Sequence, residues 1–207
     1  NYFRIYVFID NAQTYQVVEK KEDFYNAASA FGKFQNMLAD YPAKELFETI
    51  VDFHHTPKRF ENLKKAIAED KMGRLSEVKA EVEYSLSWLS KASAITDALE
   101  SGRIPTRVTH NDTKLNNVMI DDESGKGICV IDLDTVMPGS LLYDFGDSIR
   151  FGTNPAAEDE PDLSKVYMDI ELFEAYTDGF LSELKTSITK EDRKSTRLNS
   201  SHYSRSR

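Results

Sequence analysis

Apolar side chains recur every three or four positions over much of the chain, a pattern that predicts a mainly helical protein. Asp23 is expected to cap the first helix and Pro42 to end it. Thr56 is expected to cap the second helix, with Pro57 in its first turn. Helices are therefore expected over residues 24–40, 56–70, 75–100 and 163–184.

Short runs of β-branched and aromatic residues predict strands. Residues 3–9 form the first run, and the turn-forming residues 10–12 break it. Residues 117–120 and 128–131 flank a polar turn at residues 121–127, so they are expected to pair as an antiparallel hairpin. The whole pattern predicts an α+β protein that is mostly helical.

The composition disfavours several classes of partner. The chain has 207 residues, of which 40% are hydrophobic, enough for one or two compact units with a buried core. Its net charge of −9 disfavours nucleic acid, because an acidic surface repels phosphates. No apolar run approaches the ~18 residues of a membrane span. Cys129 is the only cysteine, so no intrachain disulfide can form, and a reducing, cytoplasmic location is expected.

The two ends of the chain differ from its body. The first residue is Asn1 and not Met, so the chain is expected to be a piece of a longer one. Residues 191–207 are rich in Ser, Lys and Arg and have no apolar periodicity, which is typical of a disordered tail. This tail resembles a translated cloning sequence more than the end of a domain. The alternative interpretation is a basic functional arm.

Two motifs, residues 109–117 and 130–134, hold the residues of greatest chemical interest. Asp112 is followed five positions later by Asn117, and Asp132 comes at the end of the second hairpin strand. A kinase site needs a carboxylate that accepts the proton of the substrate hydroxyl, and oxygen ligands for Mg²⁺ beside the nucleotide phosphates. The order and spacing of these three residues match that requirement.

The predicted hairpin explains how residues far apart in the sequence could meet. Asn117 begins its first strand and Asp132 ends its second, so antiparallel pairing would return both side chains to the same end. Mg²⁺ needs few protein ligands, because phosphate oxygens and water complete its shell. Asn117 and Asp132 are therefore predicted to bind Mg²⁺, and Asp112 to act as the catalytic base.

Each of these residues also has a simpler interpretation. Asp112 alone would be a turn residue or a cap, and only its combination with Asn117 and Asp132 favours a catalytic role. Lys114 could neutralise the transferring phosphoryl group, or it could be a solvated loop lysine. His110 is expected to hold the loop by hydrogen bonds rather than to take part in chemistry.

Two further acids follow the second motif. Asp134 could be a second carboxylate near the metal or a plain hydrogen-bond acceptor. Asp144-Phe145-Gly146 spells a kinase metal-binding motif, but no strand leads into it as one leads into Asp132, and it precedes an apparent helix start. Asp144 is therefore predicted to brace a loop or cap a helix, with a direct site role as the alternative.

Residues 110–121, HNDTKLNNVMID, and 130–150, VIDLDTVMPGSLLYDFGDSIR, resemble the aminoglycoside phosphotransferase and choline kinase superfamily of small-molecule kinases. The nearer likeness is to bacterial N-acetylhexosamine 1-kinase-like proteins, through FRIYVFIDNAQTYQ, FHHTPKRF and THNDTKLNNVMI, and it covers about residues 1–190. The resemblance implies a protein-kinase-like fold and an enzyme that uses ATP and Mg²⁺ to phosphorylate the anomeric hydroxyl of an N-acetylhexosamine. Asn111 departs from the Gly or Arg common in the superfamily, and Leu133-Asp134 departs from Phe-Gly.

The resemblance also implies a division of the chain. Residues 1–12 would be the last strand of a small N-terminal lobe and the hinge, 13–190 a helical C-terminal lobe, and 191–207 a disordered, non-native tail. Backbone groups of Asp10, Asn11 and Ala12 would then bind adenine. The rest of the small lobe, with its phosphate-covering loop and strand lysine, is largely missing, so the chain is expected to be inactive or nearly so on its own.

Other functions stay open on this sequence. The same fold could phosphorylate choline, homoserine or an aminoglycoside, and an acidic chain suits a cationic acceptor. A module that binds nucleotide or sugar without turnover is a second alternative, although pure binding would not require a base at Asp112. A helical interaction domain is a third, and it leaves the ordered acids unexplained. The sequence does not fix the oligomeric state.

Overall fold

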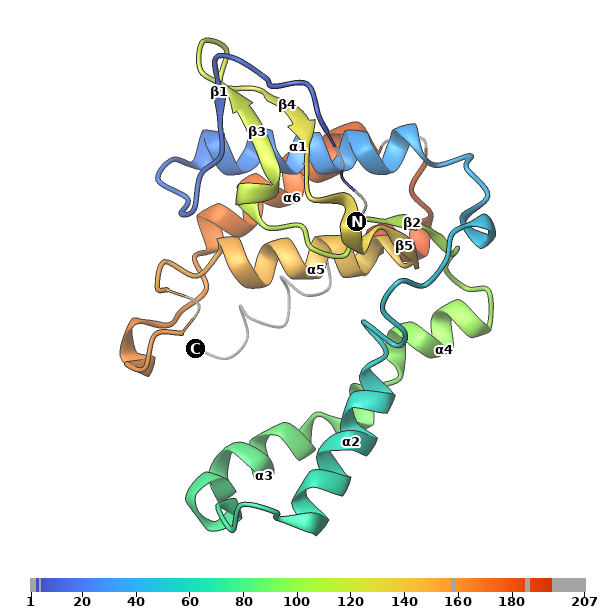
Figure 1. Ribbon diagram of the computed structural model, residues 1–207, viewed down its shortest axis with the longest axis vertical. Helices are drawn as coiled ribbons and strands as arrows, with labels where there is room; N and C mark the ends of the chain where they lie inside the picture. Colours follow the sequence, from blue (N-terminus) through green and yellow to red (C-terminus); the bar gives the residue numbers. More distant parts are fainter. Residues whose placement is uncertain (1–2, 4, 158, 185–186, 195–207) are drawn as a thin grey trace. The chain divides into compact units, whose positions relative to one another are not determined.

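The computed structural model describes residues 3, 5–157, 159–184 and 187–194. The chain divides into unit 1, residues 1–49 and 107–207, and unit 2, residues 50–106. Unit 1 contains β1 (Ala12–Gln13), α1 (Lys21–Met37), β2 (Arg107–Thr109), β3 (Val118–Asp121), β4 (Gly127–Val130), β5 (Met137–Gly139), α5 (Leu141–Gly152) and α6 (Ile170–Glu183) (Figure 1). Unit 2 contains α2 (Thr56–Glu69), α3 (Lys79–Ser87) and α4 (Ala94–Glu100). Short 3₁₀ helices cover Ala43–Glu45, Leu75–Val78, Leu89–Lys91, Leu115–Asn117, Leu133–Thr135 and Leu163–Lys165.

Helices α1 and α6 form the core of unit 1, where they run side by side (Figure 1). Phe24 and Phe31 on α1, and Tyr176 and Phe180 on α6, are each at most 1% exposed. Gly32 permits this close approach, because a Cβ atom there would lie 2.6 Å from the Phe180 carbonyl oxygen. Helix α5 packs against both helices and completes the apolar core.

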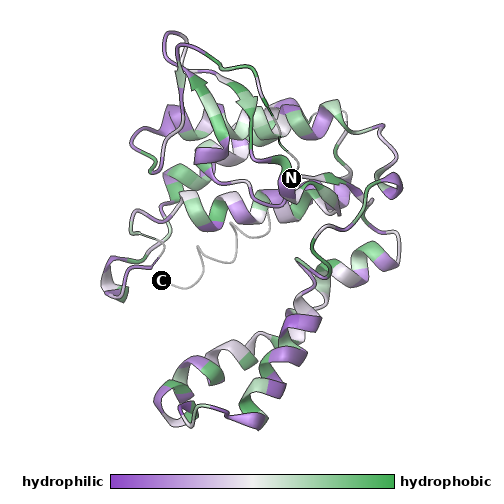
Figure 2. Cartoon of the chain, viewed as in Figure 1, coloured by the Kyte–Doolittle hydropathy of each residue, from purple (hydrophilic) through white to green (hydrophobic). Residues whose placement is uncertain are grey.

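The strands of unit 1 form two small antiparallel sheets. In the first, β3 lies between β1 and β4, with Ala12 opposite Asp121 and Val118 opposite Val130. Strands β3 and β4 are the predicted hairpin; they are largely hydrophobic (Figure 2) and contact α1. In the second sheet, β2 pairs with β5. This combination of helices with small sheets confirms the predicted α+β class.

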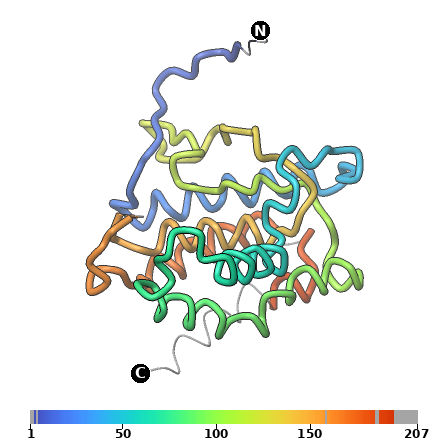
Figure 3. The backbone as a smooth tube through the Cα atoms, turned by 60° about the horizontal axis from the view of Figure 1, so that its bottom comes forward, coloured from blue at the N-terminus to red at the C-terminus, as the bar shows by residue number. Residues whose placement is uncertain are grey.

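The strand predicted at residues 3–9 does not form. Residues 3 and 5–9 have no strand geometry, and the first strand is β1. A strand needs a neighbour to pair with its backbone groups, whereas this segment runs away from the helices of unit 1 (Figure 3). Its side chains are exposed, Phe3 by 85% and Val7 by 90%. The prediction is wrong because aromatic and β-branched residues favour a strand only where a pairing partner is available.

The ends of the first two helices differ from the predicted ones. Helix α1 begins two residues before Asp23, which therefore lies in the first turn and is not the cap. The helix ends at Met37, well before Pro42. In α2 the cap residue is His55 rather than Thr56, because the imidazole accepts a hydrogen bond from a backbone N–H of the first turn at 3.2 Å.

The other two predicted helices are shorter than expected. Helix α6 begins at Ile170 and not at residue 163, because the Asp169 carboxylate accepts hydrogen bonds from two first-turn N–H groups at 2.9 and 3.1 Å. Residues 75–100 are not one helix but α3 and α4 with short 3₁₀ turns. Ser85 and Ser87 donate hydrogen bonds to backbone carbonyls of the preceding turn, which weakens a regular helix at this point.

Unit 2 buries few side chains. Helices α2 and α3 have no buried residue, and the buried positions of this unit are Thr96, Ala98 and Ile104.

Over the whole described part of the chain, no helix combines the length and the apolar character that crossing a membrane requires.

Within unit 1, a buried ion pair holds the segment after α6 to β2. Arg107 at the start of β2 lies 3.8 Å from Asp192, and the two side chains are 10% and 1% exposed. Arg107 also donates a hydrogen bond to the Ser187 carbonyl. Because residues 190–194 are helical, the predicted disordered tail does not start at residue 191. The rest of that tail, residues 195–207, lies outside the described residues.

Candidate active site

The loop of residues 110–117 connects β2 to β3 and contains three of the predicted site residues. Its start is fixed by Thr109, which is fully buried and donates its hydroxyl proton to the Met137 carbonyl of β5 at 2.9 Å. Its end is fixed by the 3₁₀ turn Leu115–Asn117, in which Leu115 belongs to the apolar core. The loop is therefore anchored on both sides by packing within unit 1.

Asp112 lies in the middle of this loop with its carboxylate 26% exposed. Oδ1 is 3.4 Å from the Lys114 ammonium, and Oδ2 accepts a hydrogen bond from the Asn117 amide at 3.2 Å. A partly exposed carboxylate held on both oxygens is oriented and still accessible to a small molecule. This is the arrangement that a proton acceptor needs.

The Asn117 side chain has only one orientation that satisfies its neighbours. Its amide nitrogen donates to the carbonyl oxygen of Asp112 at 2.8 Å and to the carboxylate of the same residue at 3.2 Å. Both partners are acceptors, so the NH₂ group faces them and Oδ1 faces the other way. An amide oxygen held beside a carboxylate fits the chemistry of a Mg²⁺ ligand.

His110 connects the loop to the hairpin. It is fully buried, and the rings of Phe31 and Phe34 of α1 contact its imidazole edge-on, with 5.5 and 5.8 Å between ring centroids. Its Nε2 lies 2.9 Å from the Ile131 carbonyl oxygen, and its Nδ1 accepts the N–H of Asp112 at 3.3 Å. Because the carbonyl can only accept, Nε2 is the donor in this hydrogen bond. His110 therefore holds the loop, as the sequence predicts.

Asp132 follows Ile131, whose N–H donates to the Asn117 carbonyl oxygen at 2.9 Å. Asp132 has a positive φ of 59°, which turns the chain out of β4 and into the 3₁₀ turn Leu133–Thr135. Its side chain is exposed. The hairpin thus joins Ile131, the residue before Asp132, to Asn117 by a backbone hydrogen bond.

Asp144 lies inside α5 and not before a helix start. Helix α5 begins at Leu141, because the Ser140 hydroxyl accepts a first-turn N–H at 3.2 Å and caps it. Asp144 therefore belongs to the first turn of α5, where it faces the interior and is fully buried. The predicted position of the helix start is wrong.

Three donors converge on the Asp144 carboxylate. It accepts the N–H of His110 at 3.0 Å, the N–H of Asn111 at 2.7 Å and the amide of Gln35 at 2.5 Å. Burial raises the pKa of Asp144, and the hydrogen bonds from the two backbone N–H groups partly offset this effect. Asp144 braces the 110–117 loop, in agreement with the first of its two predicted roles.

Asn111 ties the loop to the turn that follows Asp132. Its side-chain nitrogen donates to the Thr135 carbonyl at 2.9 Å. Its side-chain oxygen lies 3.0 Å from the Thr109 hydroxyl oxygen and shares the single proton of that hydroxyl with the Met137 carbonyl. In return, the Thr135 hydroxyl donates to the His110 carbonyl at 2.7 Å. Asn111 has a φ of 68°, a conformation that Asn and Gly adopt more easily than other residues.

Replacing Asn111 should separate the cost of its hydrogen bonds from the cost of its backbone conformation. Asn111→Gly is expected to lower the free energy of unfolding by about 1–3 kcal/mol, because hydrogen bonds are lost while a positive φ stays allowed. Asn111→Ala is expected to cost about 1 kcal/mol more, because its Cβ disfavours this φ. Urea denaturation measures both values, and equal stability of the two variants would contradict the left-handed backbone at this position.

The residues predicted to contact adenine lie at the other end of β3 from Asn117. Ala12 pairs with Asp121, and the Asn11 carbonyl accepts the N–H of Asp122 at 2.9 Å. At about 3.3 Å per residue, the steps from Asn117 to Asp121 put this end about 13 Å from Asn117. The structure does not bring Asp10, Asn11 and Ala12 together with Asp112, and the carbonyl of Asn11 is already engaged within the chain.

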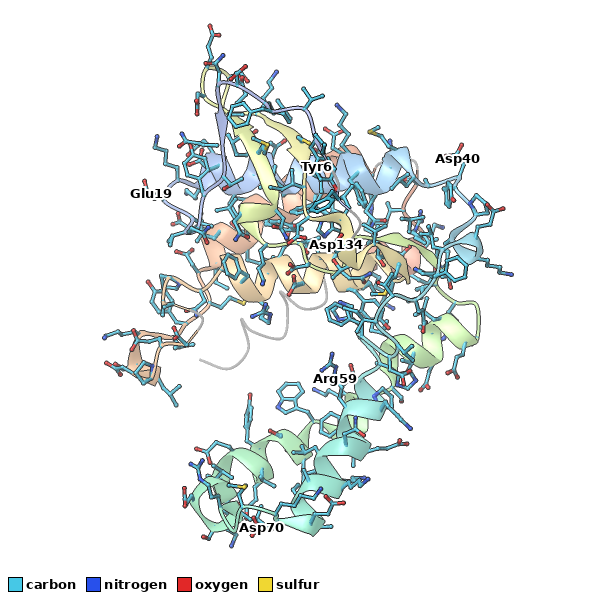
Figure 4. All side chains as sticks on the ribbon, in the orientation of Figure 1. Tyr6, Glu19, Asp40, Arg59, Asp70 and Asp134 are labelled. Carbon is cyan, nitrogen blue, oxygen red and sulfur yellow. The ribbon has the colours of Figure 1, made fainter. Side chains whose placement is uncertain are left out.

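Asp134 (labelled in Figure 4) lies on the turn between β4 and β5, and its side chain is exposed. Its carbonyl accepts a hydrogen bond from the Thr49 hydroxyl at 3.3 Å. Among the described residues, no three His, Cys, Asp or Glu side chains are grouped to hold a metal ion.

A surface hollow of about 570 Å³ is lined by residues of α1 and α6, including Lys21 and Glu171, and by none from the 110–117 loop.

In a comparison with models of protein-family sequences, the phosphotransferase enzyme family matches residues 2–174 of this chain. The match spans most of the chain and includes the 110–117 loop, the β3–β4 hairpin and α5. The chain therefore belongs to the phosphotransferase enzyme family. This membership confirms the resemblance to the aminoglycoside phosphotransferase and kinase-like superfamily, and with it a protein-kinase-like fold and a kinase-type enzyme.

Proposed function

We propose that this protein is an ATP-dependent kinase that phosphorylates the anomeric hydroxyl of an N-acetylhexosamine. The observation that supports this most is the contact of Asp112 with Asn117 at 3.2 Å. It joins a carboxylate suited to accept a proton to an amide suited to bind Mg²⁺. A module that only bound a nucleotide would not need the carboxylate. The family supports the class of reaction, and this pair of side chains supports the choice of residues that we propose for it.

Each residue of the site has one role in the proposal. Asp112 accepts the proton of the acceptor hydroxyl while the hydroxyl oxygen attacks the γ-phosphorus of ATP. The bond from that phosphorus to the β–γ bridging oxygen breaks, and ADP leaves. Lys114, 3.4 Å from Asp112, neutralises charge on the transferring phosphoryl group. Asn117, through Oδ1, and Asp132 would hold Mg²⁺. When bound, this ion screens the negative charge of the nucleotide phosphates.

The base of the nucleotide would lie at the other end of β3. Backbone groups of Asp10, Asn11 and Ala12 would bind adenine, although the Asn11 carbonyl already accepts the N–H of Asp122. The separation of about 13 Å along β3 supports this arrangement. An extended nucleotide needs its base and its terminal phosphates in different places.

The choice of a sugar acceptor is supported by the likeness of residues 3–16, 53–60 and 109–120 to N-acetylhexosamine 1-kinase-like proteins. A kinase for a cationic alcohol, such as choline or an aminoglycoside, is the second candidate, and the net charge of −9 favours it. For either acceptor we propose a cytoplasmic enzyme without nucleic-acid or membrane partners, in line with the acidic composition and the single cysteine.

A panel of acceptors tests this proposal. The natural protein that contains these residues, incubated with MgATP, is expected to release ADP fastest with N-acetylglucosamine or N-acetylgalactosamine. ³¹P NMR should place the phosphate on the anomeric carbon, and EDTA should stop the reaction. Faster transfer to choline, homoserine or an aminoglycoside would replace the sugar proposal. Binding of ATP without ADP release for any acceptor would favour a binding module.

A further inference from the structure

Thr113, the residue after Asp112, is held by α5 at each of its polar atoms. It is 1% exposed, so none of these atoms can exchange its partner for water without a cost. Its N–H donates to Asp147 at 2.9 Å, and its hydroxyl donates to the Asp144 carbonyl oxygen at 2.5 Å. Its own carbonyl oxygen accepts the Ser148 hydroxyl at 2.5 Å. Helix α5 therefore fixes the backbone beside the proposed base.

The Ser148 hydroxyl is in turn oriented from α6. Ser148 is 1% exposed, and the hydroxyl of Tyr176, which is fully buried, lies 2.6 Å from it. A hydroxyl has one proton, and the Thr113 carbonyl can only accept. The Ser148 proton therefore points to Thr113, and the Tyr176 proton must point to Ser148. Three residues from three segments form a one-way chain of hydrogen bonds.

The Tyr176 hydroxyl has little freedom to move out of this chain. Its ring packs against Phe24 at 4.7 Å, Phe145 at 5.8 Å and Phe180 at 5.9 Å between ring centroids. Burial raises the pKa of Tyr176, so the group stays protonated and remains a donor. The aromatic core of unit 1 thus determines where the proton of Ser148 points.

We propose that Ser148 and Tyr176 are positioning residues that act in series, through the Thr113 carbonyl, to hold Asp112 in the orientation for proton transfer. The proposal rests on the proposed function for the role of Asp112, and it adds two residues distant from the loop in sequence. It differs from a purely structural role in one respect. In a series, Tyr176 can influence Asp112 only while Ser148 has its hydroxyl.

This difference predicts a non-additive pair of substitutions, measured in the natural protein that contains this chain. Ser148→Ala is expected to lower kcat about tenfold, because the buried Thr113 carbonyl loses its donor. Tyr176→Phe is expected to lower it about threefold, because Ser148 keeps its bond but loses its orientation. The double variant is expected to match Ser148→Ala, and the KM for ATP should change less than twofold in all three.

The matched control is Thr177→Val on α6. It removes a neighbouring hydroxyl that donates to the Phe173 carbonyl at 2.7 Å, within the same helix. This variant should lose thermal stability and keep its kcat. A double variant whose loss equals the product of the two single losses would overturn the proposal. So would a kcat that follows the melting temperature across all variants, Thr177→Val included. If Ser148→Ala does not fold, Tyr176→Phe compared with Thr177→Val decides between a positioning and a structural role.

Amide hydrogen exchange tests the same inference without an acceptor. Exchange over residues 110–117 is expected to accelerate about tenfold in Ser148→Ala and about threefold in Tyr176→Phe, and to stay unchanged in Thr177→Val. Unchanged exchange in Ser148→Ala would contradict the positioning role. If the wild-type protein transfers phosphate to no acceptor, the proposed function fails, and this measurement still decides whether the series of hydrogen bonds holds the loop.

Discussion

Asp112→Asn in the natural protein should lower the rate of phosphate transfer by about 10³-fold, the largest effect that we expect from any single substitution. An amide cannot accept the hydroxyl proton at neutral pH, so the acceptor would have to attack without a base. The amide oxygen can still accept the hydrogen bond from Asn117, so the loop should keep its shape. ATP affinity, measured by calorimetry, should therefore change little while the turnover measured from ADP release falls.

Asp40→Asn is the matched control for this result. Asp40 is an exposed acid after the end of α1 (Figure 4), and its replacement removes the same charge outside the loop. The control is expected to keep full turnover. Full activity of Asp112→Asn would refute the base assignment. A parallel loss of ATP affinity would instead assign Asp112 to nucleotide binding.

Asp144→Asn should have the largest effect on stability, lowering the free energy of unfolding by about 2–4 kcal/mol. Both carboxylate oxygens of Asp144 face N–H donors, from His110, Asn111 and Gln35. An asparagine there must direct its own NH₂ group at one of these donors, because it has a single acceptor oxygen. Urea denaturation measures the loss.

The same substitution should reduce turnover at least about tenfold, since the N–H groups held by Asp144 belong to the two residues before Asp112. Asp40→Asn again serves as control, with a stability within about 0.5 kcal/mol of the wild type. Wild-type stability in Asp144→Asn would show that the carboxylate is not the acceptor for the two backbone N–H groups.

The sequence predicts the parts of this fold that depend on local pattern. The hairpin around residues 121–127 forms because both of its strands are apolar and its turn is polar. The run at residues 3–9 has the same local signal, yet a strand also needs a partner, and the signal gives no information about one. The predicted helix ends are wrong for a related reason. Several polar residues precede α6, and the sequence does not show that Asp169 is the one that caps it.

The predicted helix start lies after Asp144, although the pattern around this residue indicates that Asp144 lies inside α5. Ser140 is a cap residue, and Leu141, Asp144, Phe145 and Ser148 follow at the spacing of one buried helix face. An acid on an apolar face must find donors, which predicts a bracing role. The contact between Ser148 and Tyr176 has no such signal, because it joins two helices that are 28 positions apart in the chain.

The ion pair between Arg107 and Asp192 limits how far the protein can be shortened for crystallisation or engineering. Deleting residues 187–194 would remove both the counter-ion of Arg107 and the Ser187 carbonyl to which it donates, three positions before the 110–117 loop begins. A buried guanidinium without a counter-ion destabilises the fold. Strand β2, which contains Arg107, is therefore expected to shift so that this side chain reaches water. Trimming from this end should therefore stop no earlier than Lys194.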